Sequence, residues 1–192
     1  MKTANAAAIA AQTPATSPQV SYAIDPAHAG AYFKVRHLMV AHVRGELGTV
    51  TGEAVIDLRD QGNSRVDARI DLGGIDTRNP ERDAHLKSAD FLDVVRFPEL
   101  TFRSTEVRRG ADDLLLVKGD LTLRGVTRPV TVEVELSGEI QDPWGNAKRG
   151  VTATVKLHRK EFGVSWNAAM DGGGLVVGDV VDVTIEAELV RK

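Results

Sequence analysis

Apolar and polar residues alternate with a period of two along most of this chain, and the pattern limits the folds open to it. The alternation is unbroken over residues 65–72, where the apolar side carries Val66, Ala68, Ile70 and Leu72 and the other side is charged throughout. Successive side chains of a β-strand point to opposite faces, so the pattern predicts strands with one apolar and one wet face. Such one-sided strands are typical of antiparallel sheets.

Further segments repeat this alternation. Their apolar positions are Phe33, Val35, Ala54, Ile56, Leu58, Phe102, Leu115, Val117, Leu121, Leu123, Val130, Val132, Val134, Leu136, Val151, Ala153, Val155, Leu157, Val181, Val183, Ile185, Ala187 and Leu189. Turn-forming residues separate the segments, as in Asp60–Asn63, Arg109–Gly110 and Asp142–Asn146. We therefore predict an all-β domain, a closed antiparallel barrel or a sandwich, of about eight strands.

One segment, Pro80–Ser88, reads instead as a helix. Asn79 is a good N-cap, Pro80 fits the first helical position, and acidic residues follow in the first turn. Phe97-Pro98 ends the segment before the next strand begins. We expect a short side helix at one side or end of the barrel.

The ends of the chain and its overall charge set further limits. Of the 192 residues, the first twenty are mostly Ala, Thr, Ser, Pro and Gln, whose weakly apolar run lacks the roughly 7–15 strongly apolar residues of a signal core. We expect a disordered tail over 1–20, one domain over 21–192, and a cytoplasmic rather than periplasmic or secreted location. A net charge of −3 and the absence of cysteine argue against a nucleic-acid partner, disulfides and cysteine-ligated metals. No apolar run approaches the length needed for stable membrane insertion.

The inward positions are mostly small or β-branched, and aromatic residues make up 5% of the chain. A barrel of about eight strands lined in this way either encloses a ligand cavity or is filled by its own side chains. The composition is compatible with both interiors. The charged outer faces are likewise compatible with a monomer or a homodimer.

Several short motifs resemble the YceI-like family, described as polyisoprenoid-binding proteins with a lipocalin-like barrel. The similarity runs from Tyr22 to about Leu189. It rests on Tyr22-x-Ile24-Asp25-x-x-His28, Phe33-x-Val35-x-His37-Leu38, Ile75-Asp76-Thr77, Arg82-Asp83-x-His85-Leu86, Gly119–Val130, Arg159, Phe162-Gly163 and Leu175–Val181. Ala29 stands where the family usually has Ser, and Leu47 and Val50 stand where aromatic residues are common. These differences bear on the identity of the ligand.

The resemblance implies a lipocalin-like barrel that carries a long apolar molecule of isoprenoid or fatty-acyl type, without cofactor, metal or catalysis. The positions expected to contact the ligand are the alternate, apolar positions of the strands, which face the barrel interior, with Trp166 at the mouth. They are Phe33, Val35, Val66, Ala68, Ile70, Phe102, Leu121, Val132, Val134, Val155, Trp166, Val183 and Ile185.

Two other functions stay open. A small-molecule enzyme could use His85 and Asp83, although the five histidines form no H-E-x-x-H motif and no serine lies in a Gly-x-Ser-x-Gly elbow. The more favoured interpretation is that Asp76, Arg82, Asp83 and His85 fix the helix to the barrel rim, with the arginine paired to a carboxylate. The remaining alternative is a stress-associated structural module whose interior is filled by side chains.

Two further features lie in predicted turns. Arg124-Gly125 is predicted to be the turn of a hairpin, favoured as a solvated turn over a basic patch that meets a partner or a ligand headgroup. Trp144 follows Asp142-Pro143 and is expected to make an anchoring contact rather than to recognise a ligand.

Overall fold

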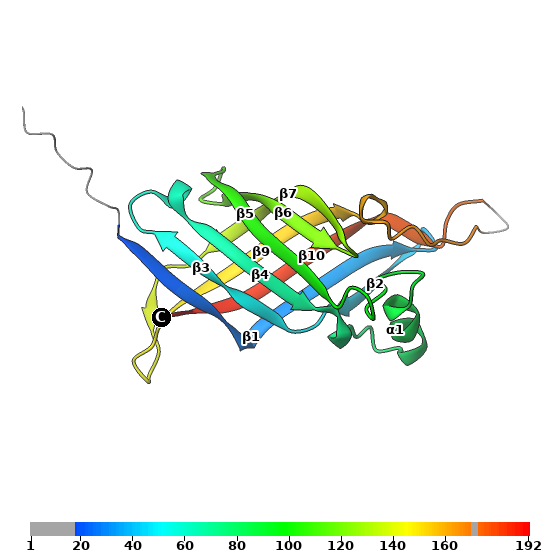
Figure 1. The fold of residues 1–192 in the computed structure, drawn as a ribbon, viewed down its shortest axis with the longest axis horizontal. Coiled ribbons are helices and arrows are strands. Elements are labelled where there is room, and N and C mark those ends of the chain that lie inside the picture. The colour runs from blue at the N-terminus through cyan, green and yellow to red at the C-terminus, as the bar shows by residue number, and fades with distance from the viewer. Residues whose placement is uncertain (1–17, 170–172) are drawn as a thin grey trace, which may run out of the picture.

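Eight antiparallel strands close into a barrel in the computed structural model of this chain, which describes residues 18–169 and 173–192 (Figure 1). The barrel strands are β1 (Gln19–His37), β3 (Val50–Asp57), β4 (Arg65–Asp71), β5 (Glu99–Arg109), β6 (Leu115–Leu123), β7 (Val126–Leu136), β9 (Ala147–His158) and β10 (Val177–Arg191). They pair in the order β10-β1-β3-β4-β5-β6-β7-β9, and β9 pairs with β10 to complete the circle. The predicted antiparallel barrel with a short helix is confirmed. The predicted tail falls almost wholly on residues 1–17, outside the described part of the chain.

Two short strands lie beside the barrel. β2 (Ala41–Glu46) pairs with the second half of β1, and β8 (Ile140–Gln141) pairs with β9. β1 pairs with β3 through its first residues, Gln19–Ala23, and with β2 through Tyr32–His37. β2 and β3 therefore follow one another along the same edge of β1.

The register of the barrel places the alternate apolar residues of neighbouring strands opposite one another. Across β3 and β4, Val50 lies opposite Ile70 and Ala54 lies opposite Val66. Ala68 of β4 in turn lies opposite Phe102 of β5. Directly opposed residues share a face of the sheet, so these apolar side chains all point into the barrel.

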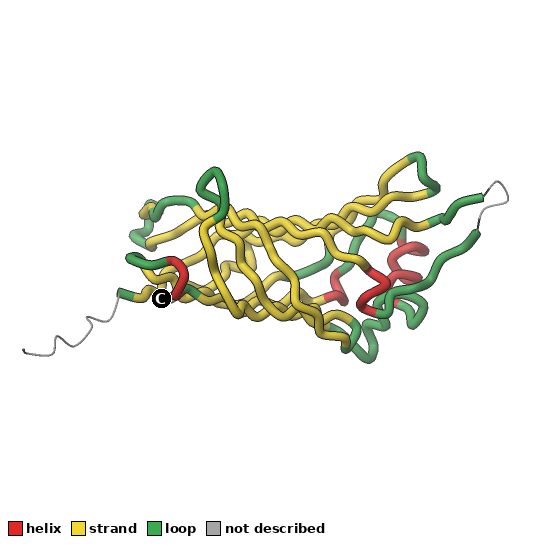
Figure 2. Tube along the Cα trace, turned by 90° about the horizontal axis from the view of Figure 1, so that it is seen from above, coloured by secondary structure: helices red, strands yellow, loops and turns green. Residues whose placement is uncertain are grey.

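The two ends of the barrel carry different structures (Figures 1 and 2). At one end lie α1 (Pro80–Lys87), the 3-10 turns η2 (Leu72–Gly74) and η3 (Arg159–Phe162), and the turn between β1 and β2. We call this the helix end. The C-terminus and the turn between β8 and β9 lie at the opposite end, the terminus end.

α1 begins and ends close to the predicted residues. The side chain of Asn79 accepts a hydrogen bond from the backbone N–H of Arg82 at 3.0 Å, and Pro80 occupies the first helical turn. Ser88 follows the last helical residue, and its N–H donates to the carbonyl of His85. No helix in the described ranges is long and apolar enough to cross a membrane.

Candidate functional site: an apolar interior in two chambers

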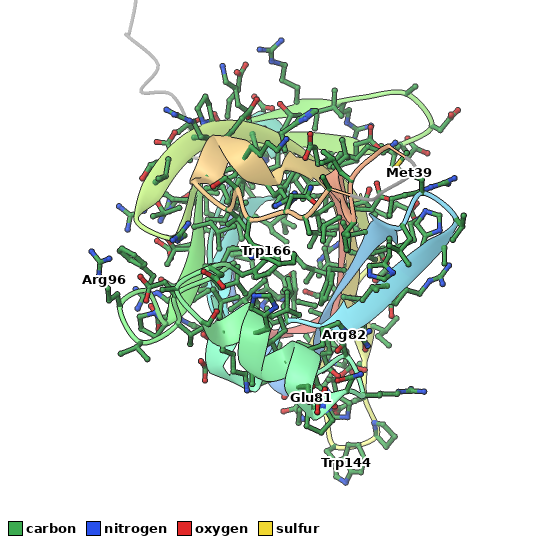
Figure 3. All side chains as sticks on the ribbon, turned by 90° about the vertical axis from the view of Figure 1, so that its right-hand side faces the viewer. Met39, Glu81, Arg82, Arg96, Trp144 and Trp166 are labelled. Atoms are coloured by element: carbon green, nitrogen blue, oxygen red, sulfur yellow. The ribbon has the colours of Figure 1, made fainter. Side chains whose placement is uncertain are left out.

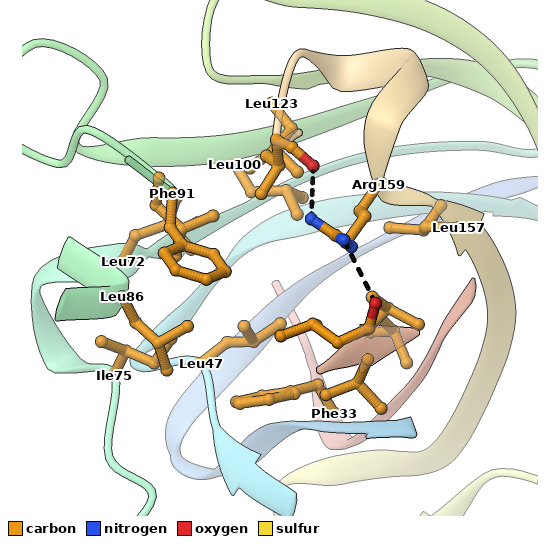
Figure 4. A pocket seen from close by; sticks show the side chains of 16 residues that line it. Phe33, Leu47, Leu72, Ile75, Leu86, Phe91, Leu100, Leu123, Leu157 and Arg159 are labelled. Atoms are coloured by element: carbon orange, nitrogen blue, oxygen red, sulfur yellow. Dashed lines mark hydrogen bonds between the residues drawn. The ribbon is translucent and has the colours of Figure 1, made fainter. Parts of the chain in front are cut away.

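The helix end of the barrel contains a cavity of about 100 Å³ (Figure 4). Its walls come from strands, from α1 and from the loops that cover this end. They are Phe33, Val35, Leu47, Leu72, Ile75, Leu86, Phe91, Leu92, Leu100, Leu123, Leu157, Arg159, Val164, Val177, Val181 and Val183. We call this cavity the outer chamber. All its lining residues except Arg159 are apolar.

A second cavity, of about 160 Å³, lies toward the terminus end and is walled almost entirely by strands. It reaches Val107 and Leu115 on one side and Leu136 and Val151 on the other. Gly119, an inward position of β6, makes room for the ring of Phe102, because a Cβ there would lie 2.5 Å from that ring. We call this cavity the inner chamber.

Leu100, Leu157 and Val183 line both chambers. They come from β5, β9 and β10, and each is well buried. The two chambers therefore lie in series along the barrel and meet at these three side chains, which we call the partition.

Most of the predicted ligand-contacting positions face these chambers. The inner chamber is lined by Val66, Ala68, Ile70, Phe102, Leu121, Val132, Val134, Val183 and Ile185, and the outer one by Phe33, Val35 and Val183. Val155 packs against the main core but lines neither chamber. Trp166 also lines neither chamber, and lies among the loops of the helix end (Figure 3).

Most residues of the outer chamber were not among the predicted ligand-contacting positions. Ile75, Leu92 and Val164 lie in loops, where strand parity gives no signal, and Leu86 lies on α1. Leu100 and Leu157 do follow strand parity, so their places in the partition could have been predicted.

Arg159 is the one charged residue lining the outer chamber, and only 4% of it is exposed. Its guanidinium donates to the carbonyls of Val164 and Trp166, each at 2.8 Å, and of Gly178 at 2.8 Å. A longer bond of 3.3 Å reaches the carbonyl of Val177 (Figure 4). Burial lowers the pKa of Arg159, and the nearby carboxylate of Asp179 partly opposes this. The guanidinium thus ties the loop after η3 to the start of β10.

Arg124 makes a second link across the helix end. Together with Gly125 it forms the predicted two-residue turn between β6 and β7, and both residues have positive φ. Interpreting this turn as merely solvated was wrong, because the Arg124 guanidinium donates to the carbonyls of Ala89 and Gly163. One side chain therefore joins the segment after α1 to the segment after η3.

Aromatic side chains meet between these same two segments. The ring of His85 on α1 stands edge-on to Phe91 and Trp166, with centroids 4.9 and 4.8 Å away. Phe91 and Trp166 lie 5.1 Å apart, and His85 Nε2 lies 3.1 Å from a carboxylate oxygen of Asp90. Figure 3, looking onto the helix end, places Trp166 near its centre.

The residues near the start of α1 were predicted to fix the helix to the barrel rim, and their side chains bond to the loop just before the helix. Asp83 accepts hydrogen bonds from the N–H and the hydroxyl of Thr77, and Arg82 donates to the hydroxyl and carbonyl of the same residue. Arg82 therefore bonds to Thr77, and the expected pairing with a carboxylate was wrong. The carboxylate of Asp76 accepts from the N–H of Arg78. Asp83 and His85, the candidate catalytic pair, bond to different partners.

Trp144 was expected to make an anchoring contact. It is 84% exposed, at the tip of the turn between β8 and β9, so that expectation was wrong. The turn is held instead by Asp142, whose carboxylate accepts from the backbone N–H groups of Trp144 and Asn146 and from the Asn146 side chain.

Only one group of potential metal ligands clusters within the described ranges. Asp25, His28 and Glu188 bring their donor atoms within 4.8 Å of one another. The ammonium of Lys148 lies 2.8 Å from Glu188 and 3.9 Å from Asp25. Because this cation already neutralises the carboxylates, the group is better described as an ion-pair network.

Comparison with known sequences identifies one family. The sequence profile of the YceI-like domain matches residues 22–189. A UPF0312 protein of Vibrio parahaemolyticus is 38% identical over 159 residues, which cover 82% of this chain and 84% of that protein.

Solved structures share the barrel. BcnA of Burkholderia cenocepacia superposes with a TM-score of 0.75 at 18% identity, covering 86% of this chain and 98% of that one. A polyisoprenoid-binding domain from Saccharophagus degradans, implicated in plant cell wall breakdown, gives a TM-score of 0.66 at 12% identity, covering 90% of this chain and 99% of that one. At these identities the likeness shows the fold alone.

Proposed function

Because this chain belongs to the YceI-like domain family, we propose that its barrel binds and carries a long apolar lipid of polyisoprenoid, isoprenoid-quinone or fatty-acyl type. The observation that carries the proposal is the pair of chambers in series, walled almost wholly by apolar side chains. The related barrel from Saccharophagus degradans is a polyisoprenoid-binding domain, which supports a binding rather than a catalytic role.

The chemistry of the walls favours a long guest over a small one. A buried methylene contributes about 0.8 kcal/mol, whereas association costs on the order of 4–15 kcal/mol. A guest without hydrogen-bonding partners therefore needs roughly ten or more buried carbons to bind usefully. A small polar metabolite would need polar anchors, and the one buried cation of the outer chamber, Arg159, already donates to backbone carbonyls.

The size of the chambers indicates how such a guest would bind. An engineered cavity of about 150 Å³ in another protein binds benzene, so each chamber alone suits a compact guest. A long chain must occupy both chambers and pass the partition. We therefore expect Leu100, Leu157 and Val183 to change rotamer when the ligand binds, because their side chains lie where the two chambers meet.

Native mass spectrometry of the protein as purified, with organic extraction of the same sample, tests this function. We expect a retained apolar molecule, and displacement of a fluorescent apolar probe by prenols or fatty acids that strengthens with chain length. Affinity that levels off at the size of a single chamber would contradict occupation of both. A protein without extractable lipid that displaces no probe at any chain length would contradict the function itself.

A further inference from the structure

The turn between β1 and β2 exposes three consecutive apolar side chains at the helix end. Leu38 is 40% exposed, Met39 52% and Val40 81%. None of the three lines either chamber of the barrel. The barrel's ligand therefore does not explain them, and their exposure to water needs another reason.

The backbone of this turn makes the choice of residues more unusual. The N–H of Val40 donates to the carbonyl of His37 at 3.2 Å, and the two central residues, Leu38 and Met39, have φ values of 50° and 60°. Positive φ at both central positions is the type I′ geometry, for which Asn-Gly is strongly preferred because larger side chains are strained there. Leucine and methionine thus occupy positions where folding alone would favour asparagine and glycine.

The strands that carry the turn are basic. The chain has a net charge of −3, yet no aspartate or glutamate occurs between Asp25 and Glu46. Lys34 lies opposite Arg44, although like charges directly opposed across strands are unfavourable, and Arg36 lies opposite His42. Lys34 pairs with Asp182, and Arg36 donates to the carbonyl of Met39.

Arg44 is exposed, and the structure gives it no ion-pair partner among the described residues. On β1 and β2 the charged side chains nearest the tip are therefore basic, and the neighbouring acids Glu46, Asp76 and Asp182 lie no nearer to the tip than Lys34 and Arg44.

The turn lies at the same end as the outer chamber. The N–H of Leu38 donates to the carbonyl of Val176 at 2.8 Å, next to Val177 of the chamber wall. In Figure 3 Met39 stands at the rim of the helix end, with Trp166 nearer its centre. A surface that touched the tip would therefore also face the loops that cover the outer chamber.

We propose that the β1–β2 turn docks this end of the barrel on an anionic lipid surface, with Leu38, Met39 and Val40 entering the interface and Arg44 facing the lipid headgroups. Apolar side chains beside cations are the combination that binds the boundary of an anionic bilayer, where burial of apolar surface and attraction to lipid charge add. The docking is peripheral and involves no span of the bilayer.

The test is co-sedimentation of the full chain with vesicles, either of phosphatidylcholine alone or containing about one third phosphatidylglycerol. We expect binding to the anionic vesicles only, weakened by salt. The double variant L38N/M39G should bind at least tenfold less, while its melting temperature stays equal or rises because Asn-Gly suits the turn. Arg44→Gln should weaken binding about fivefold, since one basic residue near an anionic surface contributes about that factor.

Trp144→Ser provides the matched control, because it removes an exposed apolar side chain from the terminus end. It should leave vesicle binding unchanged. Binding of the apolar probe, measured without vesicles, should be the same in all these variants, so docking and lipid carriage are judged separately.

Equal binding to both kinds of vesicle, no binding to either, or undiminished binding by L38N/M39G would overturn the proposal. So would a dimer in sedimentation velocity that L38N/M39G dissociates, because the tip would then be covered by a second copy of the chain.

Discussion

The two ends of the barrel are held together by different kinds of interaction. At the terminus end, Tyr22 is fully buried in an apolar cluster, its hydroxyl donates to Glu139 and it accepts from Arg149 at 3.1 Å. At the helix end, loops are held by arginines that donate to backbone carbonyls. Hydrogen bonds between loops can open without separating barrel strands. We therefore expect the ligand to enter and leave at the helix end. We expect the free energy of unfolding to depend on both ends.

The largest effect is expected from Arg159→Leu. The change leaves the carbonyls of Val164, Trp166 and Gly178 without their donor, and each unsatisfied buried acceptor costs about 1–3 kcal/mol. Chemical denaturation should show at least about 3 kcal/mol of lost stability. Arg159→Lys should recover part of it. A loss below about 1 kcal/mol would mean that these carbonyls readily find water.

A smaller loss, of about 1–2 kcal/mol, is expected for Tyr22→Phe. The ring and its apolar contacts stay, while Glu139 and Arg149 each lose a hydrogen-bonding partner. The dissociation rate of an apolar probe, measured by stopped flow, should stay the same. Faster dissociation would place an exit at the terminus end.

Arg124→Ala should have the opposite effects, with little loss of stability and faster dissociation of the probe. Arg124 is only partly buried, so loss of its hydrogen bonds should lower stability by about 1 kcal/mol. Probe dissociation should become several times faster, because Ala89 and Gly163 are no longer joined. Arg128→Ala, a change at an exposed arginine of the same hairpin, is the control. If both variants release the probe at the native rate, the link does not control access.

The smallest expected effect is on the stability of the protein at acidic pH. Hydrogen bonds from Asn146 lower the pKa of Asp142 at the terminus end, and the hydrogen bond from His28 lowers that of Asp25. A lowered folded-state pKa gives stability that is present above the unfolded value, about 3.9, and is lost as the pH falls through the folded value. When the pH is lowered below about 4, the melting temperature of the Asp142→Asn variant should therefore fall less than that of the native protein. An identical acid profile would show that Asp142 adds no pH-dependent stability.

The helix end is built largely from loops and the rest of the barrel from strands, and this difference explains what could be predicted from the sequence. Parity along β4 identifies Val66, Ala68 and Ile70 as inward residues, and all three line the inner chamber. The capping residues before Pro80 likewise predict the helix. These signals are local, because they arise from the geometry of one strand or one helix end.

The walls of the outer chamber depend on long-range packing instead. Ile75 and Val164 are buried in loops, and nothing in the sequence nearby shows which element they will face. Arg159 and Arg124 belong to the motifs of the family resemblance, but the sequence does not show what they bind, because their acceptors are backbone carbonyls. Such acceptors become apparent only when the loops are placed in space.

The central claim is that the barrel interior holds a long apolar chain, and paired tryptophan variants test it most directly. Ala68 lines the inner chamber, whereas Arg69, the next residue of β4, is exposed on the outer face. Titration with a long prenol should show binding lost in Ala68→Trp and kept in Arg69→Trp, with both proteins folded by circular dichroism. Undiminished prenol binding by a folded Ala68→Trp protein would contradict the account, because the chain would then have to bind without entering the inner chamber.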